Sequence, residues 1–545
     1  MNHTTKIETK DSLKATLARI GDTNVIKITF PYDVQLLHQV RSLIGRKWHD
    51  KVKCWSAPLL EDNIKQLQSW GFTIDPRLYQ AIDARELKIQ KAVNLPIKGF
   101  KGELYPFQKQ GVEFLERTNG RALIADEMGL GKTVQALAWL HLHPENRPAI
   151  IVVPASLKLN WKKEAERWLH NPKIEVLQGS NTRKLKGDII IINYDILHSW
   201  VDPLREIDPK VLITDECHYY KSNKARRTKA VKLLAKSVDY FIALSGTPIV
   251  NKPIEAYNAL RLINQDLFKN FRHFVDRYCS PKWNGFGWSY EGASNTQELH
   301  NLLKSTVMIR RLKKDVLPEL PEKTRSFFPL QLTNQSEYTK ADNDLIQFLR
   351  ETKGNDAARK AIFAEALTRI EVLKQLAVKG KLEEAISWIT NFLEVENKLV
   401  VFATHKFVID ALVEKFQGVA VKIDGSCTPT ARQQAVDAFQ SNPNIHLFIG
   451  NIQAAGVGIT LTASSNVAFL ELPWTPGALV QAEDRCHRIG QKDNVNIYYL
   501  LATDTIEDKI AELLDRKRKT LDAVLDGIET DQESLLTELI KQYQS

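Results

Sequence analysis

Two stretches of the chain alternate short, β-branched apolar runs with segments of helical periodicity. In the first stretch the apolar runs lie at residues 122–125, 149–153, 188–193, 211–214 and 241–244. The second stretch repeats the alternation, with runs at residues 398–402, 419–423, 445–449 and 467–470. Because continuous apolar strands separated by helices are typical of parallel sheets covered by helices, the pattern predicts an α/β fold with two lobes.

The remaining segments differ in texture from these two lobes. Residues 1–90 combine apolar alternation at 25–30, helical periodicity at 34–44 and a Trp-rich, hairpin-like piece at 46–58, which predicts a small β/α module. Residues 250–395 are helical and charged, apart from an aromatic, Gly-rich interruption at 283–288. We expect an N-terminal module (1–90), a first lobe with a helical insertion (91–325), a helical insertion or linker (326–395), a second lobe (396–505) and a C-terminal helical brace (506–545).

Composition agrees with a folded protein of several units. The 545 residues exceed what one hydrophobic core usually supports. The chain is 43% hydrophobic and 26% charged, and no apolar run reaches membrane-spanning length, so we expect no membrane association. The five scattered cysteines and the absence of an apolar targeting core argue against a disulfide framework, a zinc site and secretion. The formal charge of +10 is a mild bias toward anionic partners.

A strand-to-helix turn in the first lobe has the residue types that bind phosphate. Glycines let backbone N–H groups curl around a phosphate, ahead of a helix N-terminus whose dipole favours anions. Lys132 is placed to reach the β- and γ-phosphates of a nucleotide, and the Thr133 hydroxyl to ligate Mg²⁺. Asp126 occupies the first glycine position of the strict Gly-x-x-x-x-Gly-Lys-[Ser/Thr] pattern, so the loop is a variant. The nucleotide-binding candidates of this loop are Asp126, Glu127, Met128, Gly129, Leu130, Gly131, Lys132 and Thr133.

Two acidic residues follow the apolar run at 211–214. Asp215 and Glu216 end a predicted buried strand, at the sheet edge where the phosphate loop also lies. We expect Asp215 to hold Mg²⁺ through water and Glu216 to orient and deprotonate an attacking water. Together with Lys132 they are the candidate catalytic residues of the first lobe.

The second lobe ends in a segment that carries two arginines at helical spacing. Gln481, Arg485 and Arg488 are spaced i, i+4 and i+7, so on a helix they share one face. If the second lobe closes over the first, Arg485 and Arg488 are arginine fingers that stabilise the charge developing during γ-phosphate cleavage, and Gln481 lies at the nucleotide. The alternative is a basic helix on the protein surface.

These segments, taken with others in the same order, resemble the Swi/Snf-type family of superfamily-two helicase-like ATPases. The motifs that carry the resemblance lie at residues 126–133, 215–218, 244–248, 309–316 and 481–491, and the match runs from about 100 to 525. The resemblance implies two RecA-like lobes, ATP and Mg²⁺ as cofactors, and ATP-driven tracking along duplex DNA. It also implies that Gln108 contacts the adenine base and that the segment 245–247 couples hydrolysis to lobe movement.

The same resemblance points to polar residues at strand ends as a DNA track. Relatives commonly carry a hydroxyl residue followed by Thr where this chain has Asn451 and Ile452, so that contact departs from the family pattern. Polar side chains of this kind suit phosphate oxygens rather than base edges, and we expect weak sequence preference. The implied DNA contacts are Ser156, Asn160, Trp161, Asn193 and Tyr194 in the first lobe and Thr404, Ser426 and Asn451 in the second.

The roles of two further segments stay open at this point. A basic run either grips DNA or contacts the other lobe, and it consists of Lys304, Arg310, Arg311, Lys313 and Lys314. The N-terminal module resembles the HARP domain of annealing helicases through residues 30–33, Arg46, Trp48 and Trp55, as does the segment 292–299. That resemblance implies binding at branched DNA or single-strand/double-strand junctions. The two tryptophans either stack on unpaired bases or form the core of the module.

The leading hypothesis is an ATP-dependent, monomeric DNA translocase that tracks on duplex or branched DNA, anneals or remodels forks and serves DNA repair. A strand-separating helicase is a second hypothesis, although no inserted wedge or pin is recognisable in the sequence. The third is a nucleotide-gated clamp that holds DNA without processive movement. We expect such a protein in the cytoplasm or nucleoid of a prokaryote or virus, or in the nucleus of a eukaryote.

Overall fold

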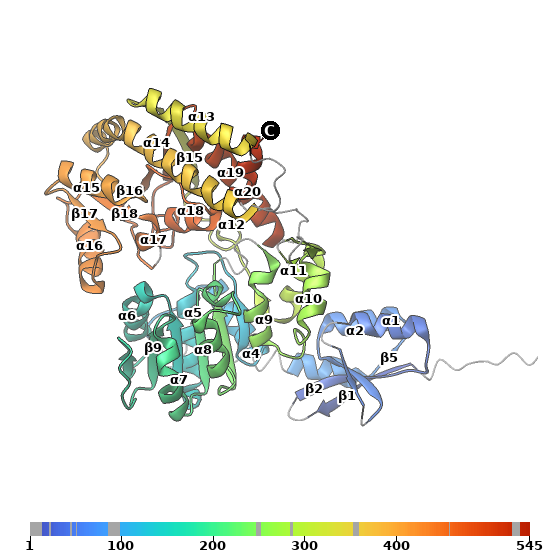
Figure 1. Ribbon diagram of the computed structural model, residues 1–545. Helices are drawn as coiled ribbons and strands as arrows, with labels where there is room; N and C mark the ends of the chain where they lie inside the picture. Colours follow the sequence, from blue (N-terminus) through green and yellow to red (C-terminus); the bar gives the residue numbers. More distant parts are fainter. Residues whose placement is uncertain are drawn as a thin grey trace, which may run out of the picture.

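The computed structural model describes residues 13–20, 23–43, 46–50, 52–84, 99–246, 252–283, 287–290, 292–351, 359–456, 458–525 and 535–544. Within these residues the chain forms two lobes that face each other and a smaller N-terminal module beside the first lobe (Figure 1). No helix in the described part of the chain has the length and apolar character needed to cross a membrane.

The first lobe is built on a parallel sheet whose strand order is β14-β6-β11-β10-β7-β9-β8. All five predicted strands are present, and β7, β9 and β10 are buried along their whole length, which explains their continuous apolar runs. The strands are β6 (Arg121–Ile124), β7 (Ala149–Val153), β8 (Ile174–Val176), β9 (Ile189–Asn193), β10 (Val211–Asp215), β11 (Tyr240–Leu244) and β14 (Met308–Ile309). The helices are α4 (Pro106–Arg117), α5 (Lys132–Leu142), α6 (Lys158–Trp168), α7 (Leu197–Glu206), α8 (Arg226–Leu234), α9 (Tyr257–Ile263), α10 (Phe271–Tyr278) and α11 (Thr296–Thr306).

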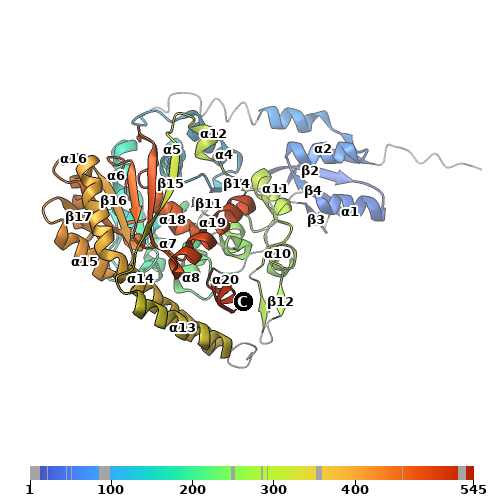
Figure 2. The same ribbon diagram turned by 90° about the horizontal axis from the view of Figure 1, so that it is seen from above.

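The second lobe is also a parallel sheet, with the order β15-β20-β19-β16-β18-β17. Helices cover it on both sides in Figure 1 and Figure 2, so the predicted fold of two α/β lobes is confirmed. The strands are β15 (Lys323–Leu330), β16 (Leu399–Ala403), β17 (Ala420–Ile423), β18 (Leu447–Asn451), β19 (Asn466–Phe469) and β20 (Val495–Ala502). The helices are α13 (Gln335–Glu351), α14 (Arg359–Val395), α15 (Lys406–Lys415), α16 (Pro429–Ser441), α17 (Ile452–Ala455), α18 (Pro476–Glu483), α19 (Ile506–Leu525) and α20 (Leu535–Gln544), and the short α12 (Lys313–Val316) precedes them between the lobes.

The predicted boundaries at 325 and 395 are wrong. β15 pairs with β20 over eight residues, so the second lobe begins near residue 322. Val378, Ala385 and Ile389 of α14 are fully buried in one cluster with the apolar residues of β16. The segment 326–395 is therefore part of the second lobe rather than an insertion. Helical periodicity shows that a helix has an apolar face, but it does not show which sheet that face covers.

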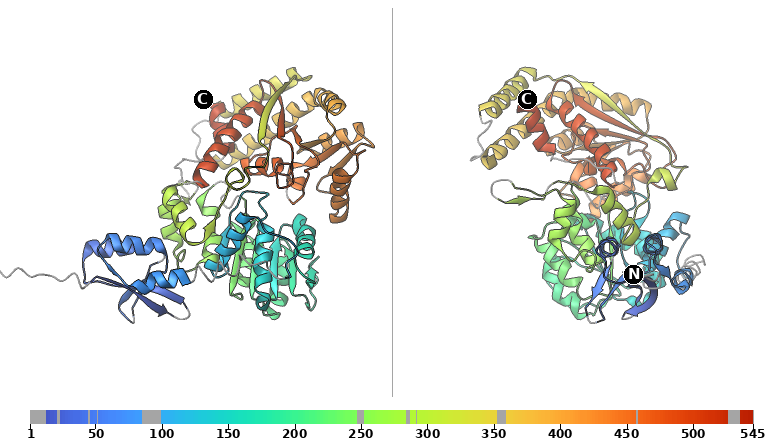
Figure 3. Two further views of the ribbon diagram at one scale, coloured as in Figure 1. Left: turned by 180° about the vertical axis from the view of Figure 1, so that it is seen from behind. Right: turned by 90° about the vertical axis from the view of Figure 1, so that its right-hand side faces the viewer.

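The N-terminal module is a sheet in the order β3-β4-β2-β1-β5, with α1, α2 and the helical residues 76–84 packed on it (Figure 3). Trp55 packs against the module core, whereas Trp48 is 44% exposed, with the ring centroids 5.4 Å apart. Trp55 therefore fits the interpretation as a core residue of the module, and Trp48 fits the interpretation as a residue that stacks on unpaired bases. Lys47 Nζ lies 3.3 Å from Asp266 Oδ2 of the first lobe, which places the module against that lobe. The elements are β1 (Lys14–Ile20), β2 (Thr23–Thr29), α1 (Val34–Ser42), β3 (Lys47–His49), β4 (Cys54–Pro58), α2 (Glu61–Ser69) and β5 (Thr73–Ile74).

The C-terminal helix α19 is anchored to the second lobe by a buried ion pair. Lys381 of α14 is fully buried, and its Nζ lies 2.5 Å from Glu507 Oε2 and donates to the Leu500 carbonyl over 2.6 Å. Glu507 Oε2 also accepts the Ala502 N–H over 2.8 Å. Burial raises the pKa of Glu507, and the Lys381 charge opposes this shift.

Lys381→Met is expected to destabilise the second lobe by about 3 kcal/mol, because it leaves a carboxylate buried without its cation. Adding Glu507→Gln should recover most of this loss, since the amide is neutral and its carbonyl keeps the Ala502 N–H bonded. Calorimetric melting of the purified protein measures both effects. The exposed substitution Glu383→Gln on the same helix is the control and should leave the melting temperature within about 1 °C. Equal melting temperatures for Lys381→Met and the unchanged protein would contradict the assignment.

Candidate active site

The turn between β6 and α5 is shaped by a buried ion pair. Asp126 is fully buried, and Arg311 reaches it from the segment that follows β14. Arg311 Nε donates to Asp126 Oδ1 over 2.9 Å, and its Nη2 pairs with Oδ2. The Arg311 N–H donates to the same Oδ1 over 3.1 Å, and Gln135 Nε2 donates to Oδ2 over 3.0 Å. Because both carboxylate oxygens are paired, a charge is tolerated where other phosphate loops carry glycine.

Two glycines let this loop pass close to its neighbours. Gly129 and Gly131 adopt φ angles of +86° and +76°, a region that glycine enters without a steric penalty. A Cβ on Gly131 would lie 2.5 Å from Gln108 Nε2 of α4. A Cβ on Gly129 would lie 2.9 Å from Arg488 Cβ in the second lobe. The loop therefore lies between α4 and the second lobe, and only glycine fits at both positions.

Lys132 lies inside the curl of the loop. Its Nζ donates to the carbonyls of Asp126 over 2.8 Å and Glu127 over 3.3 Å. Burial lowers the pKa of Lys132, and the charge of Glu216 is the largest opposing influence. Gln108 is buried beside the loop, where its Nε2 donates to the Leu130 carbonyl over 3.2 Å.

The two predicted acids lie at the carboxyl end of β10, and both carboxylate oxygens of Asp215 accept hydrogen bonds. Its Oδ2 accepts the Trp161 indole N–H over 2.8 Å, and its Oδ1 accepts the Glu216 N–H over 3.0 Å. Burial, together with the neighbouring Glu216 charge, raises the pKa of Asp215 to about 6. The Tyr194 hydroxyl donates to the Asp215 carbonyl over 2.7 Å, so this end of the strand is held on two sides.

Glu216 is held in its ionised form by its surroundings. Burial alone would raise the pKa of Glu216, but His218, Lys132 and Arg485 together keep it below the ordinary value. His218 Nδ1 lies 3.3 Å from Glu216 Oε2, and Ser245 Oγ donates to the same oxygen over 3.3 Å. A carboxylate that stays ionised beside a second one whose pKa is raised has the properties of a general base.

The two arginines of the second lobe reach the cleft, although not from a helix. α18 ends at Glu483, and the Arg485 and Cys486 N–H groups bond to carbonyls three residues earlier, which tightens the chain into turns. The prediction that Gln481, Arg485 and Arg488 share a helical face is therefore wrong. Arg485 Nη1 and Arg488 Nη1 nevertheless both donate to the Ile459 carbonyl, over 3.4 and 3.2 Å. Arg485 Nη2 lies 3.9 Å from Met128 Sδ of the phosphate loop.

Burial, with the charge of Arg488 next in size, lowers the pKa of Arg485 to about 10. Two guanidinium groups held side by side in the protein interior repel each other, and this arrangement favours an anion between or beside them. Their position against the phosphate loop makes a triphosphate the anion that fits.

Part of the basic run at 304–314 connects the lobes rather than facing solvent. The Lys313 N–H donates to Glu127 Oε2 over 2.7 Å, and its Nζ lies 2.9 Å from Asp484 Oδ2 and donates to the His487 carbonyl over 2.6 Å. Burial lowers the pKa of Lys313 to about 8, against the attraction of Asp484. Arg311 and Lys313 are thus used inside the cleft, whereas the Lys304 and Lys314 side chains are exposed. Direct DNA contact is excluded for the first two in this arrangement.

The residues present fit a bound Mg²⁺–nucleotide. The two glycines leave no room for a side chain in the phosphate loop, and Lys132 points into the space that the loop encloses. The candidate ligand atoms on the other side of this space are oxygens, which hard divalent cations prefer. Thr133 and Asp215 would hold the metal ion, and Lys132, Arg485 and Arg488 would hold the phosphates. Of the segment 245–247, Ser245 and Gly246 lie within the described residues, and Thr247 lies outside them.

The implied DNA residues of the first lobe divide into two groups. Ser156 and Asn160 are partly exposed, next to the carboxyl end of β7, and Asn193 ends the neighbouring strand β9. Trp161 and Tyr194 are fully buried, and both hydrogen-bond to Asp215. The prediction that their side chains touch DNA is therefore wrong, because these groups position the acidic dyad from inside the lobe.

In the second lobe the corresponding residues form a connected set. Asn451 caps α17, and its Nδ2 donates to the Thr404 carbonyl over 2.8 Å, so this amide orients the Thr404 loop. Glu471, which the sequence did not single out, accepts the N–H groups of Thr404 over 2.7 Å and His405 over 2.9 Å. Ser426 is exposed at the end of β17, where its hydroxyl donates to Asp424 Oδ1 over 2.5 Å.

The two lobes come into close contact beside Ser156. Gly458 of the second lobe has a φ of +77°, and a Cβ there would collide with Leu157 Cδ2 of the first lobe. Leu157 follows Ser156 directly, so this predicted DNA residue lies next to a contact between the lobes.

Comparison with known proteins agrees with this geometry. Residues 107–379 match the SNF2-related domain, and residues 380–490 match the helicase conserved C-terminal domain. The human DNA annealing helicase and endonuclease ZRANB3 is 35% identical over 78% of this chain and 41% of its own length. The Xenopus laevis SWI/SNF-related matrix-associated actin-dependent regulator of chromatin subfamily A-like protein 1 is 33% identical over 90% of this chain and 52% of its own length. The Caenorhabditis elegans homolog of the latter is 37% identical over 93% of this chain and 75% of its own length. The chain spans about half the length of the two vertebrate relatives.

Arg311→Ala is expected to destabilise the first lobe by about 3 kcal/mol and to raise the KM for ATP, because Asp126 is left buried without its cation and the loop loses its shape. Adding Asp126→Asn should restore most of the stability. Thermal unfolding and ATP titration of the four proteins measure both effects. Lys314→Ala removes an exposed charge from the same basic run and is the matched control. An Arg311→Ala protein that melts and binds ATP like the control would refute this role for the pair.

Proposed function

The chain belongs to the SNF2-related family of helicase-like ATPases, and on that premise we propose that it is an ATP-dependent translocase that tracks on duplex or branched DNA. The observation that carries the proposal is that charged groups of both lobes meet at the cleft. Arg485 and Arg488 come from the second lobe, and Lys132, Asp215 and Glu216 come from the first. A site divided between two lobes changes when they separate, so each ATP cycle is coupled to lobe movement.

The chemistry follows from what each side chain does. Mg²⁺–ATP supplies the electrophilic γ-phosphate, with part of its negative charge neutralised by the metal ion. Lys132 binds the terminal phosphates, and Thr133 and Asp215 would hold the metal ion. Glu216, ionised and fixed by His218 and Ser245, orients a water molecule and takes its proton. Arg485 and Arg488 stabilise the charge that develops on the departing phosphate oxygens.

The partly exposed polar residues on both sides of the lobe interface support the DNA assignment. Ser156, Asn160 and Thr404 carry neutral donors that suit phosphate oxygens, so the protein would follow the backbone rather than the base sequence. The human relative is named as a DNA annealing helicase, which favours rewinding or fork remodelling over strand separation. In this proposal the N-terminal module contributes binding at junctions, with the exposed Trp48 available for stacking.

The test of the proposed function is ATP hydrolysis with no DNA, single strands, duplex and forks, compared side by side. Duplex and forks should stimulate turnover, and fork regression or triplex displacement should accompany it. A clamp would bind DNA in an ATP-dependent way without sustained turnover, and that result would overturn the translocase proposal.

Lys132→Ala and Glu216→Gln are each expected to abolish DNA-stimulated hydrolysis while DNA binding stays largely intact, because neither side chain lies among the proposed DNA contacts. Glu216→Gln should also retain ATP, since losing the base spares the ground-state contacts. Steady-state turnover and fluorescence anisotropy with labelled duplex measure the two properties. The exposed change Glu166→Gln serves as the control. Turnover near the control rate in either variant would show the active-site assignment to be wrong.

Arg488→Ala should reduce kcat by about a thousandfold with a much smaller change in ATP affinity, because its charge acts mainly on the transition state. Arg485→Ala should behave in the same way. Pre-steady-state turnover and nucleotide binding separate kcat from affinity. If both single variants turn over normally, the two arginines have a structural role only.

Duplex binding should fall steeply with salt and vary little between unrelated sequences. Ser156→Ala or Asn160→Ala should weaken binding to all duplexes equally and leave the salt slope unchanged, because each removes a neutral donor. Loss of a Lys–phosphate contact would instead reduce the slope by about 0.9. Anisotropy titrations across a salt series, with two duplexes of equal length, measure this, and strong discrimination between the duplexes would contradict backbone tracking.

A further inference from the structure

A short aromatic hairpin projects from the first lobe at the level of the lobe interface (Figure 2 and Figure 3, right). It consists of β12 (Lys282–Trp283) and β13 (Trp288–Ser289) and lies between α10 and α11 in the chain. Trp283 and Trp288 face each other across the two strands, with ring centroids 5.8 Å apart and planes at 73°. Their side chains are 60% and 48% exposed, and neither joins a hydrophobic cluster of the described residues. Two large rings are thus presented to solvent.

The base of the hairpin is closed by hydrogen bonds and close packing. Ser280 Oγ donates to the Ala293 carbonyl over 2.9 Å, and Asn295 Nδ2 donates to the Arg277 carbonyl over 2.7 Å. A Cβ on Gly292 would lie 2.7 Å from Ser280 Cβ, so glycine is required where the two arms meet. The segment 292–299 therefore builds the support of the hairpin, which leaves the lobe in a defined direction.

The first turn of α10 supports the outer strand. The Phe271 ring packs edge-on against Tyr290, which directly follows β13, with centroids 5.8 Å apart. The Arg272 guanidinium lies 5.4 Å from the centroid of the Trp288 ring. The neighbouring Lys282 side chain is exposed. Two cations therefore lie beside the rings, and one of them, Arg272, also pairs with Asp276 over 3.0 Å. Rings beside cations suit stacked bases and their phosphates.

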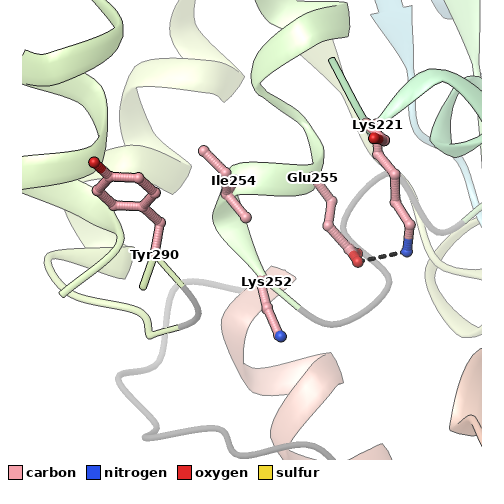
Figure 4. Close-up of a pocket in the computed structure, with 6 residues that line it drawn as sticks. Lys221, Lys252, Ile254, Glu255 and Tyr290 are labelled. Carbon is pink, nitrogen blue, oxygen red and sulfur yellow. Dashed lines mark hydrogen bonds and ion pairs between the residues drawn. The ribbon is translucent and has the colours of Figure 1, made fainter. Parts of the chain in front are cut away.

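A cavity of about 310 Å³ lies at the foot of the hairpin (Figure 4). Tyr290 links it to β13, and Lys221 and Glu255 on its wall form an ion pair of 2.6 Å. Lys221 and Lys252 thus bring two ammonium groups to the described part of the wall, a side-chain type that binds phosphate. The lining residues are Lys221, Ser222, Lys252, Ile254, Glu255 and Tyr290.

The cavity is also close in sequence to the catalytic dyad. Only the short turn η4 (Cys217–Tyr220) separates Glu216 from Lys221. The buried Asn258 donates to the carbonyls of Tyr220 over 3.0 Å and Lys221 over 2.9 Å, so the position of Lys221 is fixed relative to the acids. An anion bound at Lys221 would therefore act on a segment that is continuous with the general base.

We propose that this hairpin is a stacking site for unpaired bases at DNA branch points, and that the cavity at its foot takes the adjoining backbone phosphate. The assignment rests on the proposed DNA translocase function and adds a second single-strand contact to that of the N-terminal module. It places the contact on the motor itself, next to the cleft. The hairpin engages the unpaired arm while the lobes track on the duplex.

The test compares the unchanged protein with Trp283→Ala/Trp288→Ala. The double substitution should weaken binding to a fork with unpaired arms by about tenfold, because stacking on two rings is lost. Binding to blunt duplex and duplex-stimulated hydrolysis should not change. The matched control is Phe327→Ala/Phe328→Ala, which removes two exposed rings from β15 of the second lobe. Equal fork affinity in both double variants would overturn the proposal.

Two further measurements make the site assignment direct. Photo-crosslinking of the unchanged protein with iododeoxyuridine in the unpaired arm should yield peptides that contain Trp283 or Trp288. Lys252→Gln should lower the salt slope of fork binding by about 0.7, the value of one single-strand phosphate contact. Crosslinks found only at Trp48 or Trp55 would assign the unpaired arm to the N-terminal module and overturn the proposal. The proposal would also be overturned if the double substitution changed only the oligomeric state, because the rings would then join two copies of the chain. Failure of duplex to stimulate hydrolysis by the unchanged protein would refute the translocase function instead.

Discussion

The catalytic cleft depends on the buried pair between Arg311 and Asp126. A carboxylate without a partner in the protein interior is destabilising by several kcal/mol, so Asp126 requires the guanidinium that Arg311 brings. Arg311 belongs to the segment that leads out of the first lobe, and two residues later Lys313 pairs with Asp484 of the second lobe. The start of the phosphate loop and the path between the lobes are therefore fixed by the same stretch of chain.

Charge placement across the cleft follows from this constraint. With the lobes held in register, Arg485 approaches the phosphate loop. Against the effect of burial, His218, Lys132 and Arg485 together lower the pKa of Glu216. Groups from both lobes are therefore needed to complete the charge distribution at the cleft. Their approach places fixed charges around a transferring phosphoryl group before the reaction begins, and in many enzymes such electrostatic stabilisation contributes more to the rate than any other effect.

The surface outside the cleft has a different character. Neutral donors lie at the strand ends on both sides of the interface, where Gly458 packs against Leu157. Exposed tryptophans stand farther out, on the hairpin β12–β13 and on the N-terminal module, which contacts the first lobe through Lys47 and Asp266. Neutral hydrogen-bond donors contact the DNA backbone without contacting base edges, whereas exposed aromatic rings stack on unpaired bases. The proposed tracking and the proposed branch recognition would thus use separate parts of the surface.

The sequence by itself determined the two α/β lobes and the strands that are buried on both faces, and it predicted that Lys132, Asp215 and Glu216 lie together at one edge of the first sheet. Fully buried parallel strands appear as continuous apolar runs, and phosphate chemistry restricts a short loop to few residue types. It did not reveal β15, whose exposed residues at the sheet edge break that pattern, nor the lobe to which α14 belongs. It misplaced Trp161 and Tyr194 on the DNA surface and put Arg485 on a helix. Only the tertiary structure decided these points, and it alone joined Arg311 to Asp126 across 185 residues. The reason is physical: local periodicity reports how a segment is buried, whereas the partner that a buried charge finds depends on how distant segments pack.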